Sequence, residues 1–180
     1  GKFLNAGQTC VAPDYLLIKK EYKDMFIQHM KDIIQEFFGD QPLNNSQLVK
    51  IINQKHFDRL SHLLENQDIV IGGTGNPETL QIEPTVVDHV DQNNPLMQEE
   101  IFGPILPILT YSHIDEAIAF INQREKPLAF YIFSHDKAIQ KKLLKHCSFG
   151  GGCINDTIIH LATSELGFGG VGHSGMGAYH

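Results

Sequence analysis

The stretch "AFYIFSHDKAIQKKLLKHCSFGGGCIND", residues 129–156, indicates the fold class of this chain. It begins with a short run of apolar and aromatic residues that is typical of a buried strand. The run "DKAIQKKLLKH" (136–146) has apolar residues at helical spacing, and "GGGCIND" (150–156) leads into a second strand. Strand, helix and strand in succession predict two strands of a mostly parallel sheet covered by a helix.

The rest of the 180-residue chain continues this alternation. Helices are expected over 22–37, which Gly39 follows as a stop, over 48–64, and in "EAIAFINQ" (116–123). Strands are expected at 15–18, 69–73, 84–88 and 104–111. The sequence therefore predicts a single α/β domain whose open, mostly parallel, twisted sheet is flanked by helices. In sheets of this kind, chemistry gathers at the carboxyl ends of the strands.

Composition excludes several classes of function. The net charge of −7 and the absence of any Lys/Arg cluster longer than a pair argue against a nucleic-acid surface. No apolar run approaches the roughly 18 residues of a membrane span, and the N-terminal residues do not resemble a signal peptide. An odd number of cysteines, three, favours reduced thiols and a cytoplasmic location.

The segment "FLNAGQTC" (3–10) places a cysteine in a polar, glycine-containing turn. A thiolate attacks carbonyl carbon readily, and backbone N–H groups of a turn can hold the resulting oxyanion. Cys10 is therefore either a nucleophile that the loop presents or an ordinary loop thiol.

A second candidate segment is "MQEEIFGPILPI" (97–108). The neighbouring carboxylates Glu99 and Glu100 are either a general acid/base pair or, as is more common for paired acids in a turn, solvated side chains. Phe102, between polar residues and a Gly-Pro pair, either packs against a flat ligand or belongs to the core.

The glycine-rich segment "LGFGGVGHSGMG" (166–177) contains G-x-G-x-x-G at Gly167, Gly169 and Gly172. A dinucleotide-binding fingerprint must open a helix and be followed by an acid about 20 residues on. Only eight residues follow Gly172, so we reject that interpretation. The ten histidines form no H-x-x-x-H pair in the predicted helices, and no metal site is expected.

Together, "FLNAGQTC", "QEEIFGPILPI" and "LGFGGVGHSGMG" resemble three motifs of the catalytic domain of aldehyde dehydrogenases, in the same order and at similar spacing. The resemblance covers residues 1–180. "GQTCVAPDY" and "GGVGHSGMGAYH" look like the class 3 branch, which acts on fatty and aromatic aldehydes.

The resemblance implies a role for particular residues. Cys10 matches the nucleophile, which attacks an aldehyde and passes through a thiohemiacetal and a thioester, with NAD or NADP as the hydride acceptor. Glu100 matches the residue that binds the nicotinamide-side ribose, and Phe102 the aromatic at the nicotinamide. Phe168 and Gly169 match residues that line the substrate approach.

The resemblance also implies what lies elsewhere. In that family the dinucleotide-binding domain, which binds most of the cofactor, and the activating glutamate precede the cysteine. We therefore expect residues 1–180 to be a catalytic-domain fragment that is inactive alone, from an enzyme that forms a homodimer. The alternatives are a non-catalytic remnant that binds only a partner or ligand and, among enzymes, a semialdehyde dehydrogenase.

Overall fold

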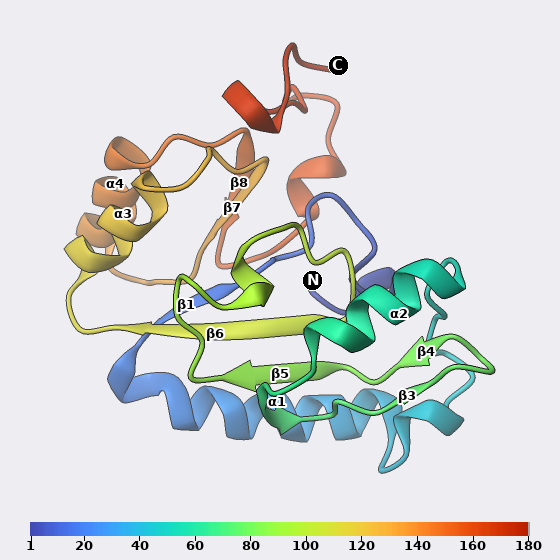
Figure 1. Ribbon diagram of the computed structural model, residues 1–180. Helices are drawn as coiled ribbons and strands as arrows, with labels where there is room; N and C mark the ends of the chain where they lie inside the picture. The colour runs from blue at the N-terminus through green and yellow to red at the C-terminus, as the bar shows by residue number, and fades with distance from the viewer. Residues whose placement is uncertain (180) are drawn as a thin grey trace. The chain divides into compact units, whose positions relative to one another are not determined.

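The computed structural model describes residues 1–179, which form two compact units. One unit comprises residues 2–110, and the other comprises residues 111–179 together with Gly1 (Figure 1). The first unit contains the predicted nucleophile and cofactor residues, and the second contains the glycine-rich segment. Each unit is described by itself.

A four-stranded sheet in the order β1-β6-β5-β2 forms the centre of the first unit. Its strands are β1 (Leu16–Lys19), β2 (Asp68–Ile71), β5 (Thr85–Asp88) and β6 (Ile105–Tyr111). β5 and β6 are parallel, with Val86 opposite Leu106, whereas β2 pairs with β5 antiparallel. All four residues of β5 and the first five of β6 are buried, as expected for central strands covered on both faces.

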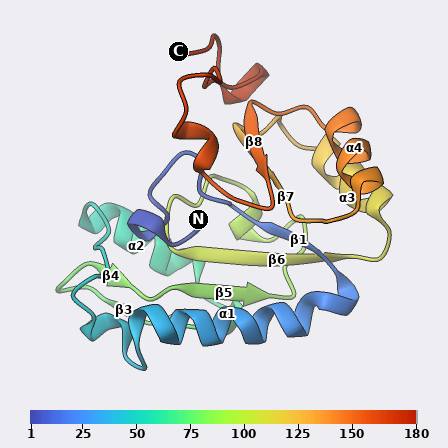
Figure 2. The same cartoon turned by 180° about the vertical axis from the view of Figure 1, so that it is seen from behind.

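Two helices flank this sheet: α1 (Lys23–Phe38) and α2 (Gln54–Leu63). Figure 1 views the unit from the side of α2, and Figure 2, turned by 180°, views it from the side of α1. Gly39 ends α1 with a φ of 78° and a ψ of −174°, a conformation that is essentially confined to glycine. A small hairpin of β3 (Gly75–Asn76) and β4 (Gln81–Ile82) completes the regular structure.

The predicted start of the second helix was wrong by six residues. Residues 48–53 are not helical, although Leu48 and Ile51 are buried and continue the apolar spacing. Asn53 begins the helix instead, because its side-chain oxygen accepts a hydrogen bond from His56 N at 3.0 Å. The apolar pattern therefore matched burial at Leu48 and Ile51 but not at Ile52, which is exposed, and the capping residue determined the boundary.

The second unit contains the strand–helix–strand segment predicted above. β7 (Ala129–Ile132) and β8 (Gly151–Ile154) are parallel, and α4 (Lys137–His146) connects them. α3 (Ile114–Asn122) packs beside α4, and both views show the two helices on the same side of these strands (Figures 1 and 2). Lys142 of α4 pairs with Asp115 of α3 at 2.6 Å.

The predicted α/β class is confirmed, with a sheet that is mixed rather than wholly parallel. Single-turn 3-10 segments supplement the main elements, at Leu4–Gly7, Lys20–Tyr22, Pro42–Asn44, Pro95–Met97, Ile159–Leu161 and Gly172–Ser174. No helix within residues 1–179 has both the length and the apolar character that crossing a membrane requires.

Candidate functional site

The loop before Cys10 has an unusual backbone. Asn5, Ala6 and Gly7 have φ angles of 51°, 53° and 71°, so three successive residues lie in the left-handed region. For residues with a Cβ this conformation costs roughly 1–2 kcal/mol each, so the surrounding contacts must hold it. The loop ends at Cys10, whose side chain is exposed, while the next residue, Val11, is almost fully buried.

The side-chain amide of Gln8 holds this loop in place. Its Nε2 donates to the carbonyl oxygens of Asn5 and Lys50, both at 3.1 Å, and its Oε1 accepts from Ile52 N at 2.9 Å. Asn5 Nδ2 donates in return to the Gln8 carbonyl at 3.2 Å. Gln8 thus joins the nucleophile loop to the segment that precedes α2, a role that the sequence analysis did not assign.

Gly7 brings the first motif against the second. A Cβ on Gly7 would lie 2.2 Å from the carbonyl oxygen of Gly103, which is closer than any side-chain carbon can approach. Gly103 in turn faces α2, since a Cβ there would lie 2.4 Å from the Leu60 side chain. The Cys10 loop therefore packs backbone to backbone against the Gly103 turn, and that turn packs against the Leu60 side chain of α2.

In the second motif, residues 97–108, the predicted cofactor residues Glu100 and Phe102 are exposed on either side of a buried residue. Ile101 is completely buried, whereas Phe102 adopts a left-handed φ of 49° and leaves 38% of its surface exposed. Glu100 is exposed, but partial burial, reinforced by the negative charge of Asp14, raises the pKa of its carboxyl group. An exposed aromatic ring can pack against the flat ring of a ligand, and a carboxylate can accept hydrogen bonds from hydroxyl groups.

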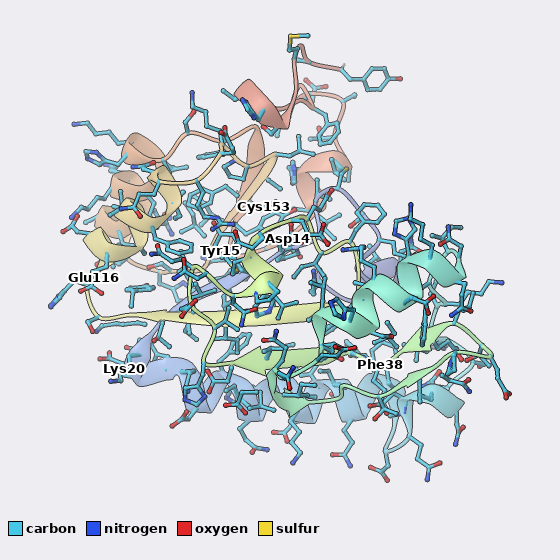
Figure 3. The ribbon with its side chains drawn as sticks, in the orientation of Figure 1. Asp14, Tyr15, Lys20, Phe38, Glu116 and Cys153 are labelled. Atoms are coloured by element: carbon cyan, nitrogen blue, oxygen red, sulfur yellow. The ribbon has the colours of Figure 1, made fainter. Side chains whose placement is uncertain are left out.

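The side chains of Asp14 and Arg59 hold the backbone between Glu100 and Phe102. Asp14, labelled in Figure 3 ahead of β1, accepts a hydrogen bond from Ile101 N at 3.1 Å through Oδ1. On the other side, Arg59 of α2 donates to the carbonyl oxygens of Glu100 and Ile101. Arg59 also pairs with Glu99 at 2.9 Å, so Glu99 is an exposed ion-pair partner rather than a purely solvated acid.

Lys2 adds a buried positive charge to this group. Only 5% of its surface is exposed, and its Nζ lies 3.8 Å from Asp14 Oδ1. Burial lowers the pKa of Lys2 to about 8, against the opposing attraction of Asp14. The sequence analysis missed Lys2, Asp14 and Arg59, because no local spacing relates residues that are far apart in the chain.

The predicted substrate residues, Phe168 and Gly169, lie in the second unit. Phe168 exchanges two backbone hydrogen bonds with Tyr179, at 2.8 and 2.7 Å. A Cβ on Gly169 would lie 2.1 Å from the Gly177 carbonyl oxygen. The glycines thus allow the segment to fold back on itself.

The core of the second unit brings Cys153 and His160 together. Cys153, labelled on β8 in Figure 3, has its Sγ 3.5 Å from Nδ1 of the buried His160. Burial lowers the pKa of His160, which favours the neutral ring. Across residues 1–179 no three His, Cys, Asp or Glu side chains gather in a way that could hold a metal ion.

We predict that Cys10 reacts with iodoacetamide several-fold faster than Cys147 at neutral pH. Cys10 is exposed, whereas Cys147 is buried and burial raises the pKa of its thiol. Peptide mass spectrometry over a labelling time course measures all three thiols at once, with half-buried Cys153 as the intermediate case. Equal rates, or a faster Cys147, would contradict the prediction.

We also predict that Gly7→Ala destabilises the protein more than Gly39→Ala. Both glycines have positive φ angles, 71° and 78°, so both substitutions introduce backbone strain. Only the Cβ at position 7 also meets a backbone carbonyl, whereas nothing lies within 4 Å of the Cβ at position 39. Thermal unfolding of the two variants tests this difference, and equal losses of Tm would refute the packing argument.

Comparison with known proteins identifies the family. All of residues 1–180 match the family model described as the aldehyde dehydrogenase family. The chain is 52% identical over 182 residues to 4,4'-diaponeurosporen-aldehyde dehydrogenase of Staphylococcus aureus, a match that covers 100% of this chain and 40% of that protein. It is 49% identical over 180 residues to rat aldehyde dehydrogenase family 3 member A2, covering 100% of this chain and 37% of that protein.

The solved structures agree with the sequences. A structure described as the substrate-bound state of Staphylococcus aureus AldH matches with a TM-score of 0.97 and 51% identity, over 99% of this chain and 40% of that one. The chain thus spans about two fifths of the length of these relatives. The class 3 features agree with the family 3 name of the rat relative, and the chain belongs to the aldehyde dehydrogenase family.

Proposed function

We propose that the full-length protein that contains this chain oxidises aldehydes to carboxylic acids, with NAD or NADP as the hydride acceptor and Cys10 as the nucleophile. One observation carries the proposal. The exposed Cys10 follows a left-handed loop that packs directly against the segment bearing Glu100 and Phe102, through the approach of Gly7 to the Gly103 carbonyl. A plain loop thiol would not require a strained backbone held by the three hydrogen bonds of the Gln8 amide.

The chemistry assigned to Cys10 proceeds in two stages. Its sulfur attacks the aldehyde carbon to form a thiohemiacetal, and backbone N–H groups of the turn are suited to hold the oxyanion. Bound NAD or NADP would supply the hydride acceptor that converts this species to a thioester. Water then hydrolyses the thioester, which releases the carboxylic acid and regenerates the Cys10 thiol.

The residues of the second motif fit the cofactor's nicotinamide end. The Glu100 carboxylate would accept hydrogen bonds from ribose hydroxyls, and the exposed Phe102 ring would pack against the nicotinamide. Buried Ile101 between them and the bonds from Asp14 and Arg59 keep both side chains on a fixed backbone. Such pre-organisation lowers the entropy that positioning a cofactor costs.

Several broader assignments belong to the same proposal. Phe168 and Gly169 would line the approach of the aldehyde, and the full-length enzyme would act as a cytoplasmic homodimer. The 180-residue chain would be inactive alone, because NAD or NADP would be bound mainly by a domain outside it.

We predict that Glu100→Gln in the full-length protein slows hydride transfer by about one to two orders of magnitude. A charge-assisted hydrogen bond contributes roughly 1.5–3 kcal/mol, and each 1.4 kcal/mol corresponds to about tenfold. Phe102→Ala should also impair the reaction, through lost packing. Pre-steady-state bursts of NADH formation measure the step directly.

Glu99→Gln is the matched control for this experiment. The pair of Glu99 with Arg59 is exposed, and such pairs contribute only about 0–1 kcal/mol, so the variant should retain nearly normal bursts. Iodoacetamide labelling of Cys10 should remain unchanged in all three variants. A damaging Glu99→Gln together with a neutral Glu100→Gln would refute the assignment of the ribose to Glu100.

A further inference from the structure

Lys2 is a buried charge that has an ion-pair partner but no hydrogen bond among residues 1–179. Among residues 1–179 its Nζ has no hydrogen-bond acceptor, and the Asp14 carboxylate lies 3.8 Å away, within ion-pair range but beyond a hydrogen bond. Burying an ammonium group is costly unless a counter-charge compensates it. Asp14 supplies that counter-charge, and the Lys2–Asp14 pair is consequently an electrostatic contact rather than a tightly bonded one.

The same Asp14 oxygen that faces Lys2 holds the second motif. Oδ1 lies 3.8 Å from Lys2 Nζ and accepts the Ile101 N–H at 3.1 Å. Burial raises the pKa of Asp14, and the charge of Lys2 opposes that effect. An ionised carboxylate accepts a stronger hydrogen bond than a neutral one, and the charge on Lys2 favours the ionised form of Asp14.

Arg59 and Glu99 add two further charges beside the backbone of Glu100 and Ile101. Arg59 holds the carbonyl side of Glu100 and Ile101 and pairs with Glu99. Burial and the repulsion of Asp14 raise the pKa of Glu100, while the attraction of Lys2 and Arg59 lowers it. The titratable and charged groups that face the segment are thus two cations, Lys2 and Arg59, and three carboxylates, Asp14, Glu99 and Glu100.

We propose that Lys2 and Asp14 are a positioning pair for Glu100, and that the positive charge of Lys2 is required for firm binding of the cofactor. This inference rests on the proposed function, in which Glu100 binds the cofactor ribose. Lys2 acts through Asp14 and the Ile101 N–H rather than by touching the cofactor. Loss of its charge leaves Asp14 and Glu100 as neighbouring anions with Arg59 as the only nearby cation among the groups named above.

The inference gives cofactor binding an alkaline limit. The pKa of Lys2 is about 8, compared with an ordinary value of 10.5, so Lys2 loses its proton as the pH rises through about 8. The dissociation constant of NADH or NADPH should then increase. The free energy of unfolding should rise over the same range, because between pH 8 and 10.5 the unfolded chain binds a proton that the folded chain has released. A purely structural lysine would not weaken cofactor binding while the free energy of unfolding rises.

Titration of the full-length protein with NADH and with NADPH, followed by cofactor fluorescence from pH 6.5 to 9.5, tests the pair. The tighter-binding cofactor should show a dissociation constant that rises by at least about threefold from pH 7 to pH 9. Lys2→Arg should remove this rise, because a guanidinium keeps its charge throughout the range. Lys2→Met and Asp14→Asn should bind the cofactor several-fold more weakly at pH 7 with little further change at pH 9.

The control variant is Lys31→Met, which removes an exposed lysine of α1 and should reproduce the wild-type profile. A wild-type dissociation constant that is flat through pH 8, or a Lys2→Arg variant that keeps the alkaline rise, would overturn the inference. Neither result depends on the Lys2→Met variant folding. Failure of the proposed function is distinguishable, because Glu100→Gln would then leave both the dissociation constant and the NADH burst unchanged.

Discussion

The close approach of Gly7 to the Gly103 carbonyl is the constraint on which the arrangement of the candidate site depends. Two loops that lie almost a hundred residues apart in the chain meet there, and any side chain at position 7 would separate them. The chain must turn tightly to make that approach. The left-handed backbone of Asn5 and Ala6 and the hydrogen bonds of Gln8 provide this turn. The polar composition around Cys10 therefore reflects backbone geometry as much as chemistry.

Sequence reasoning succeeded where local chemistry determined the outcome. The strand–helix–strand segment over 129–156 was predicted because its periodicity and turn residues are local, and β7, α4 and β8 formed as expected. The second helix began at Gln54 rather than near Leu48, because buried residues at helical spacing also occur in irregular chain that packs into a core. Cys10, Glu100 and Phe102 were singled out by residue type and by resemblance.

The supporting residues of the site could not be predicted in the same way. Asp14 contacts Ile101 across 87 positions, and Arg59 of α2 donates to the carbonyl oxygens of Glu100 and Ile101. Nothing in the spacing of Lys2, Asp14 and Arg59 distinguishes them from the other charged residues of the chain, most of which would be expected in solvent. Their roles emerge only when the fold brings β1, α2 and the second motif together.

The energetics of Lys2 and Asp14 argue that stability is not the reason for their burial. At 3.8 Å and an effective dielectric constant near 20, two unit charges attract by about 4 kcal/mol. Removing each ion from water costs several kcal/mol, so such a pair contributes little net free energy, and apolar residues of similar volume are often as stabilising. What an apolar pair cannot do is accept the Ile101 N–H, as Asp14 does, or attract the Glu100 carboxylate, as Lys2 does. The pair therefore makes most sense as a local source of charge that holds one peptide of the second motif in place.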